Sequence, residues 1–279
     1  MLCLDINQRK WVEARTLDLS RREVLGRNFY VSIPQDLGIK ISKGVGVGRI
    51  AETYISAESA VGKVGFYEID LGHPLCKLCP AEIEALIEIS ENWVNKPEVS
   101  LLYELGIAYS IVRRALGSIL ILGESLSALA TALVAERVGV SVYTLKRRFP
   151  SVKTHQLTID TWDEHRTRNI FIGGLLSDEE RSLLENKLSH ARKINIYFHP
   201  LMRGSKMILS LGEHLVLKRP RRPIISLSLL DLAKKLYRLA LEKYLYIVKP
   251  GETIPENTYV IVDFRERSGK REIIESSTP

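Results

Sequence analysis

Apolar strand-like runs alternate with amphipathic, helix-like stretches between residues 62 and 245. Strands are expected at Val64–Leu71, Ser118–Leu122, Ser141–Leu145, His155–Ile159, Asn169–Ile172 and Lys193–Phe198. Helices are expected at Pro80–Ile89, Val99–Leu116, Ser125–Val138, Glu179–Ala191 and Leu227–Tyr244. Strands that alternate with helices at this spacing favour a mainly parallel sheet covered on both faces. We therefore expect an α/β fold over this part of the chain.

The two ends of the chain have a different character. The N-terminal part is irregular, with strand-like alternation at Asn28–Ile33 and Ile39–Ile50, and the C-terminal part returns to strands around Ser268-Gly269. A chain of 279 residues also exceeds the usual size of one domain. We expect a β-rich module over residues 1–62, a main domain over residues 63–245 and a β-hairpin extension over residues 246–279.

Basic residues outnumber acidic ones, with 40 Lys and Arg against 33 Asp and Glu and a net charge of +7. An excess of this size is compatible with a polyanionic partner but does not require one. The chain has no uninterrupted apolar run of about 18 residues, and its first residues lack the pattern of a secretory signal. We expect a cytoplasmic protein that does not associate with membranes.

Three cysteines, an odd number, argue against a disulfide framework. His73, Cys76 and Cys79 form an H-x-x-C-x-x-C pattern whose side chains are compatible with zinc. A structural zinc site normally has four ligands, and no second pair is visible in the sequence. The preferred interpretation is a turn before a helix, punctuated by Pro74 and Pro80, with no metal.

Residues 118–148 have the strand, turn, helix, strand order of a dinucleotide-binding unit. The glycine fingerprint is incomplete, because only Gly123 is kept and Ser125 and Ala128 stand at the other two glycine positions. Glu124 in the same turn would repel a pyrophosphate. The basic residues Lys146-Arg147-Arg148 could bind an adenosine 2′-phosphate. An NADP-dependent oxidoreductase is therefore the alternative, ranked below a plain βαβ element of the sheet.

The C-terminal half carries an ordered set of motifs. They are Leu157–Thr161 (LTIDT), Ile170–Leu175 (IFIGGL), Phe198–Leu201 (FHPL) and Arg221–Ser226 (RRPIIS), preceded upstream by Tyr67–Leu71 and Leu105–Arg114. In this order the motifs resemble the tRNA (purine-9-N1)-methyltransferase family of the SPOUT superfamily. The resemblance covers about residues 66–245 and depends on the joint order of the motifs, since none of them is diagnostic alone.

The resemblance implies a SPOUT-type parallel sheet whose C-terminal part forms a trefoil knot, an exception to the rule that chains do not thread loops. It also implies an S-adenosylmethionine-dependent methyltransferase that acts on N1 of the purine at position 9 of tRNA, as a monomer. The glycine pair would lie against the cofactor or a crossing strand, where a Cβ would collide. The residues expected to hold S-adenosylmethionine are Leu157, Thr158, Gly173, Gly174, Leu175, His199, Pro200, Leu201, Arg222, Ile224 and Ser226.

The identity of the modified base depends on the need for a general base. N1 of adenine has a free lone pair and mainly needs alignment, whereas N1 of guanine must lose a proton. Many members of the family have an aspartate three residues after the second glycine, but here Ser177 holds that place and Asp178 follows it. This favours adenine over guanine. The candidate catalytic residues are Asp178, Asp160 and Ser177, although Ser177 and Asp178 also fit the N-cap and first-turn acid of a helix.

Contacts to RNA phosphates would come from basic residues around the expected pocket and from the N-terminal module. The candidates are Arg113, Arg114, Lys146, Arg147, Arg148, Arg166, Arg168, Lys218, Arg219 and Arg221. Each of them could equally be a solvated surface charge. A non-catalytic RNA-binding protein therefore stays open as a further alternative.

Overall fold

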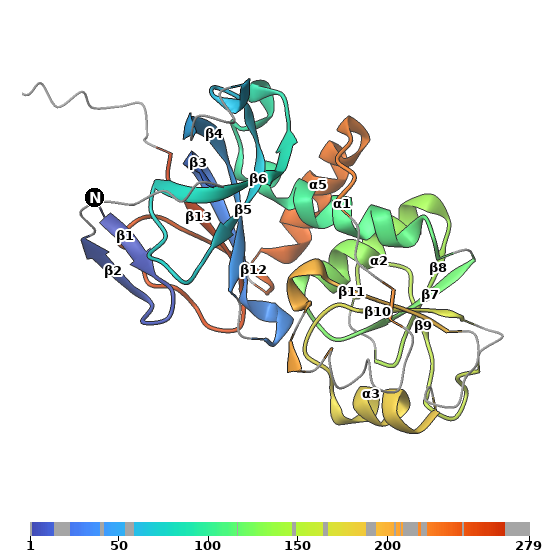
Figure 1. Ribbon diagram of the computed structural model, residues 1–279. Helices are drawn as coiled ribbons and strands as arrows, with labels where there is room; N and C mark the ends of the chain where they lie inside the picture. The colour runs from blue at the N-terminus through green and yellow to red at the C-terminus, as the bar shows by residue number, and fades with distance from the viewer. Residues whose placement is uncertain are drawn as a thin grey trace, which may run out of the picture.

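The computed structural model describes residues 2–13, 23–39, 42–53, 59–115, 117–146, 149–163, 167–187, 194–203, 205–206, 208, 217–218, 222–241 and 243–265. These residues form a β domain and an α/β domain, which lie side by side in Figure 1. The β domain combines N-terminal strands with the last two described strands. Among the described residues, no helix is both long and apolar enough to cross a membrane.

The β domain is built on a six-stranded sheet. In spatial order its strands are β12 (Leu245–Val248), β13 (Tyr259–Asp263), β3 (Glu23–Pro34), β4 (Lys43–Thr53), β5 (Val64–Asp70) and β6 (Leu78–Glu88). β6 also pairs with β3, so the sheet curls back on itself. A separate hairpin of β1 (Leu2–Asp5) and β2 (Lys10–Glu13) joins the domain through a bridge between Leu4 and Leu75.

The α/β domain contains five parallel strands. Their spatial order is β11 (Asn195–Phe198), β10 (Asn169–Ile172), β7 (Ser118–Leu122), β8 (Ser141–Thr144) and β9 (His155–Gln156). β7 and β10 have the bounds expected from the sequence. The chain runs outward from β7 through β8 to β9, and then returns to the other side of β7 for β10 and β11.

Helices cover both faces of this sheet (Figure 1). The α-helices are α1 (Leu101–Val112), α2 (Leu126–Val138), α3 (Asp178–Ser182) and α5 (Leu230–Ala240). The short helices are η1 (Gln35–Leu37), η3 (Glu91–Trp93), η4 (Pro97–Ser100), η5 (Leu183–Lys187), η7 (Pro200–Met202) and η8 (Leu227–Leu229). Because side chains alternate along a strand, Ile119 and Ile121 of β7 pack towards the α1, α2 and α5 face. Leu120 and Leu122 pack towards the opposite face, which α3 and η5 cover.

The helix expected over Pro80–Ile89 is wrong, because β6 occupies this segment. The strand pairs with β3 and with β5. The helix signals were Pro80 in the first turn and early acidic residues. Each acidic residue near a helix N-terminus stabilises the helix by only ~0.3–1 kcal/mol. Pairing with β3 over Leu78–Glu82 and with β5 at both ends of the segment outweighs these local preferences.

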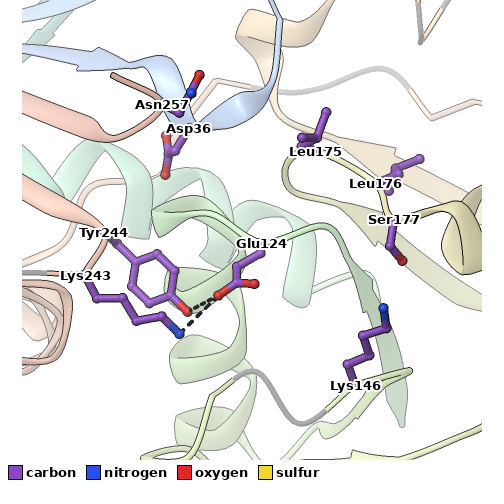
Figure 2. Close-up of a pocket in the computed structure, with 9 residues that line it drawn as sticks. All are labelled: Asp36, Glu124, Lys146, Leu175, Leu176, Ser177, Lys243, Tyr244 and Asn257. Carbon is purple, nitrogen blue, oxygen red and sulfur yellow. Dashed lines mark hydrogen bonds and ion pairs between the residues drawn. The ribbon is translucent and has the colours of Figure 1, made fainter. Parts of the chain in front are cut away.

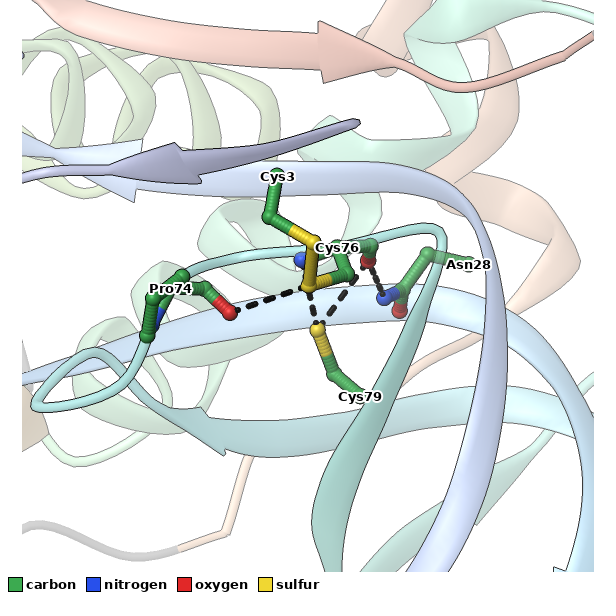
Figure 3. The surroundings of a disulfide bond; sticks show 5 residues. All are labelled: Cys3, Asn28, Pro74, Cys76 and Cys79. Carbon is green, nitrogen blue, oxygen red and sulfur yellow. Dashed lines mark hydrogen bonds between the residues drawn. A yellow bond between two sulfur atoms is a disulfide. The ribbon is translucent and has the colours of Figure 1, made fainter. Parts of the chain in front are cut away.

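The odd number of cysteines argued against a disulfide framework, but the structure contains one cross-link. Cys3 and Cys76, which are 73 residues apart, are joined by a disulfide bond (Figure 3). Cys79 is a buried thiol, and its sulfur accepts a hydrogen bond from the Cys76 N–H at 2.9 Å. Since Cys76 is oxidised, it cannot act as the thiolate ligand that the spacing of His73, Cys76 and Cys79 offers. The β1–β2 hairpin brings Cys3 to this loop, which no local pattern in the sequence indicates.

Candidate functional site

A cleft of about 690 Å³ opens between the two domains. Its lining residues, which Figure 2 shows as sticks, are Asp36, Glu124, Lys146, Leu175, Leu176, Ser177, Lys243, Tyr244 and Asn257. Glu124 follows β7, Lys146 follows β8 and Leu175 follows β10, so the cleft lies at the carboxyl end of the parallel sheet. Ligands of open α/β sheets bind at this edge, where the strand order reverses. The cleft is therefore the candidate functional site.

Two glycines allow the ends of β7 and β10 to approach closely behind the cleft. Gly123 has a φ of 83°, in the left-handed region. A Cβ added to Gly123 would lie 2.6 Å from the backbone N of Gly174, and one added to Gly174 would lie 2.9 Å from the carbonyl O of Glu124. A close approach is thus present at Gly173-Gly174, and its partner is the turn between β7 and α2.

The N-terminus of α2 points into this region, and the Leu126 and Ala128 N–H groups have partners from the protein. Ser125 is fully buried and caps the helix by accepting from the Ala128 N–H at 3.0 Å. The Ser125 hydroxyl also donates to the Gly173 carbonyl. The Leu126 N–H donates to Oδ2 of Asp36 at 2.6 Å. A carboxylate from the β domain therefore occupies the positive end of this helix.

Asp36 is the cleft residue with the most perturbed acidity. Its side chain follows β3 and η1, and the residue is only 8% exposed. Burial raises the pKa of Asp36 from 3.8 to about 7, an effect opposed by the Leu126 hydrogen bond and assisted by the charge of Glu104. A buried carboxyl group with such a pKa can hold or release a proton near neutrality.

Glu124 connects the β7–α2 turn to the segment after α5. Its Oε1 accepts a hydrogen bond from the Tyr244 hydroxyl at 2.8 Å and lies 3.1 Å from Nζ of Lys243 (Figure 2). Burial raises the pKa of Tyr244, and hydrogen bonds to Tyr244 and Glu124 raise the pKa of Lys243. The negative charge of Glu124 is thus balanced within the cleft by a lysine.

A second polar cluster is buried between the domains, beside Asp36. Nε2 of His199, at the end of β11, lies 3.2 Å from Oε2 of Glu104 on α1. Tyr259 on β13 donates to the other Glu104 oxygen at 3.3 Å. The His199 N–H is not well directed at Glu104, so neither atom of this close pair makes a well-formed hydrogen bond. Nδ1 of His199 accepts from the Leu201 N–H at 3.2 Å, which leaves Nε2 as the protonated nitrogen of the neutral ring.

The expected catalytic residues do not converge on one point. Ser177 lines the cleft, but its side chain accepts from the Glu180 N–H in a capping box that starts α3. Asp178 is the first residue of α3 and is exposed. Asp160 lies in the exposed turn after β9. The helix-cap interpretation of Ser177 and Asp178 therefore accounts for their positions.

The residues expected to hold S-adenosylmethionine are also dispersed. Leu175 lines the cleft, with Gly173 and Gly174 behind it. Thr158 forms hydrogen bonds with Thr161 in the turn after β9. The rest are a buried core residue (Leu157), the buried Glu104 partner (His199), two residues of η7 (Pro200 and Leu201) and three residues before η8 (Arg222, Ile224 and Ser226).

The expected RNA-contacting residues share no common surface among those described. Lys146 lines the cleft, Arg113 lies over the Tyr109 ring at the end of α1, and Arg168 directly precedes β10. Arg114 is half-buried and Lys218 is exposed. Arg147, Arg148, Arg166, Arg219 and Arg221 lie outside the described residues. An interaction with tRNA stays a prediction.

The sequence interpretation missed Asp36, Glu104, Lys243 and Tyr244. Asp36 could have been noticed as an acid directly after a buried strand, but the other three lie inside or next to helices without any motif. Within the described residues, no group of three or more His, Cys, Asp or Glu side chains is arranged to hold a metal ion.

No family model and no curated protein matches the sequence. Solved structures do match the fold. Staphylococcus aureus TarJ in complex with NADPH has a TM-score of 0.52 and 13% identity, over 92% of this chain and 96% of that one. A putative NADPH:quinone reductase from Mesorhizobium loti has a TM-score of 0.56 and 14% identity, over 88% of both chains. Acetophenone reductase from Geotrichum candidum in complex with NAD has a TM-score of 0.52 and 13% identity, over 94% of this chain and 96% of that one. The fold is that of these dehydrogenases and reductases.

The expected SPOUT fold with a trefoil knot is therefore wrong. The strand order β11-β10-β7-β8-β9 is that of a doubly wound sheet, and the matching structures are dehydrogenases and reductases. The assignments as a tRNA methyltransferase and as an S-adenosylmethionine-binding protein are wrong as well, because they depended on the SPOUT fold. The motif order misled because strand, glycine turn, helix and strand follow one another in any doubly wound α/β sheet.

Proposed function

We propose that this chain is an oxidoreductase that binds a nicotinamide dinucleotide in the cleft between its domains. The observation that supports this most directly is the turn from β7 through Gly123 into α2, which faces the cleft at the point where the strand order reverses. A helix N-terminus at such a point is suited to a phosphate group.

Three further features of the cleft fit a dinucleotide. Its volume of about 690 Å³ lies within the usual range of ligand sites, roughly 300–1,000 Å³. Lys146 and Lys243 both line it, with side chains 52% and 59% exposed, and supply cations for phosphates. Lys146 follows β8, the strand next to β7, which suits an adenosine ribose that carries a 2′-phosphate.

One feature does not fit. The Asp36 carboxyl group takes the N–H of Leu126 that a pyrophosphate would use, and Glu124 adds a second acid nearby. Ser125 at the second glycine position is a smaller obstacle, because its side chain is turned inward as the helix cap. The cofactor therefore fits the cleft provided that Asp36 moves away from α2.

The chain's own residues then have distinct roles. A nicotinamide supplies or accepts a hydride when it is bound. Lys146 and Lys243 would hold phosphate groups, and the apolar side chains of Leu175 and Leu176 would pack against a ring. Glu104, His199 and Tyr259 form a buried polar group between the domains, and Glu104 lies close enough to Asp36 to act on its carboxyl group.

Calorimetric titration with NADH and with NADPH tests the proposal. We expect both to bind, and we expect Lys146→Ala to weaken NADPH binding by roughly ten- to a hundredfold and NADH binding less, because one charge-assisted contact is worth ~1.5–3 kcal/mol. Lys96→Ala, which removes an exposed lysine outside the cleft, serves as the control and should change neither affinity. The proposal fails if neither dinucleotide binds at millimolar concentration.

A further inference from the structure

The η1 segment of the β domain reaches into the carboxyl end of the parallel sheet. Leu37 is fully buried in the hydrophobic cluster that contains Leu122, Ile172 and Leu176 of the α/β domain. Gly38, with a φ of 70°, packs so tightly that a Cβ there would lie 2.8 Å from Cβ of Leu175. The segment Gln35–Leu37 is therefore wedged between the two domains, at the edge of the cleft.

Asp36 extends from this segment to the start of α2. Its Oδ2 accepts the Leu126 N–H at 2.6 Å, whereas its Oδ1 is buried without a hydrogen-bond partner among the described residues. α2 spans 13 residues, so its N-terminus carries the partial positive charge that attracts anions. A protein carboxyl group thus holds the position in which this helix would bind a phosphate.

The charges around Asp36 come from several elements. Glu104 of α1, Glu124 of the β7–α2 turn and Tyr259 of β13 lie nearby, and His199 stands behind Glu104. Lys146 and the pair Lys243-Tyr244 line the same cleft (Figure 2). Burial, and after it the negative charge of Glu104, favour the protonated form of the Asp36 carboxyl group. When Asp36 leaves this environment for water, its pKa returns towards the ordinary value.

We propose that Gln35–Leu37 is an internal competitor for the cofactor site, in which Asp36 occupies the phosphate-binding end of α2 and must leave before an anionic ligand binds. This inference rests on the proposed function. Asp36 retains its proton to higher pH when it is bonded to α2 (the closed form) than when it has moved into water (the open form). Binding of a ligand to the open form therefore releases a proton between about pH 4 and pH 7. The affinity for a dinucleotide therefore rises with pH over this range, by at most about tenfold per unit, and levels off above it.

Titration of NAD⁺ between pH 5.5 and 8 tests the linkage, because its diphosphate does not titrate there. We expect the wild-type affinity to rise with pH, the affinity of Asp36→Asn to be independent of pH, and Asp36→Ala to bind at least about tenfold more tightly than the wild type at pH 6. Asp231→Asn changes a fully solvated carboxylate on α5 and should behave as the wild type. Equal pH dependence in the wild type and Asp36→Asn would overturn the proposal.

A measurement without cofactor separates this inference from the proposed function. Hydrogen exchange should show the Leu126 amide protected in the wild type and in Asp36→Asn, whose side-chain carbonyl can still accept, and faster to exchange in Asp36→Ala. Equal exchange of the Leu126 amide in the wild type and in Asp36→Ala refutes the proposal that Asp36 occupies the N-terminus of α2, whether or not a dinucleotide binds. If exchange differs as expected but no variant binds NAD⁺ or NADPH, Asp36 does occupy the N-terminus of α2 and the proposed cofactor is wrong.

Discussion

Replacing Asp36 with Asn should make the folded state more stable at neutral pH and less sensitive to pH. The carboxyl group is buried, with one oxygen bonded to the Leu126 N–H and the other unpaired. Burial raises its pKa from 3.8 to about 7, while the unfolded chain keeps the ordinary value. An Asn amide retains the acceptor for Leu126 and does not ionise, so the substitution isolates the cost of the buried charge.

The size and sign of the effect follow from the two pKa values. A carboxyl group with a raised pKa in the folded state stabilises that state relatively more at low pH, and the penalty grows as pH rises from about 4 to about 7. A shift of roughly three units corresponds to ~4 kcal/mol above pH 7. This is an upper limit, because local opening of the η1 segment would expose the charge to water at lower cost.

Urea unfolding followed by tryptophan fluorescence at pH 5, 6, 7 and 8 measures the effect. The free energy of unfolding of Asp36→Asn should exceed that of the wild type by an amount that grows with pH and reaches a few kcal/mol at pH 8. Asp231→Asn, with a side chain 94% exposed, should follow the wild type. Parallel curves for the wild type and Asp36→Asn would show that the carboxyl group ionises without penalty, which would refute the reasoning.

Two further substitutions test the packing and the cross-link. Gly123→Ala and Gly117→Ala both place a Cβ on a residue with a φ of 83°, but of the two only Gly123 has close neighbours. Denaturant unfolding should show that Gly117→Ala destabilises the fold by ~1–2 kcal/mol through backbone strain. Gly123→Ala should cost ~1–3 kcal/mol more, because its Cβ also meets the Gly174 backbone. Equal losses would contradict the close approach to Gly174. Cys3→Ser removes a disulfide that spans 73 residues and should lower the free energy of unfolding by ~4 kcal/mol, as should a reducing agent on the wild type. A variant as stable as the oxidised wild type would show that the cross-link does not stabilise the fold.

The elements whose patterns are local were predictable from the sequence. β7 and β10 are short apolar runs, and α2 begins at a serine cap and ends at Gly139 in the left-handed conformation. β6 shows the limit of such patterns, because pairing with β3 and β5 decided its conformation against the helix signals at its start. Likewise, the Cys3–Cys76 bond forms because the β1–β2 hairpin packs against a loop from which Cys3 is separated by 73 residues of the chain.

The candidate site was predictable only in part. Gly123, Lys146 and the glycine pair after β10 follow from the order of strand, turn and helix, and they support the dinucleotide alternative that the incomplete fingerprint placed second. Ser125 argued against that alternative because serine replaces glycine there, yet the structure turns its side chain inward as a cap. Asp36 could not be assigned, because its partner Leu126 lies 90 residues away.

The sequence by itself determined the strand, helix and strand run from β7 through α2 to β8, and the apolar strands β10 and β11, because hydrophobic periodicity and helix caps act over a few neighbouring residues. Only the tertiary structure decided the order of the parallel strands, the joining of β12 and β13 to the N-terminal strands, and the placement of Asp36 at the end of α2. These features depend on contacts between residues far apart in the chain. The same local order fits both a knotted SPOUT sheet and a doubly wound sheet, and the arrangement of the strands in space separates the two folds.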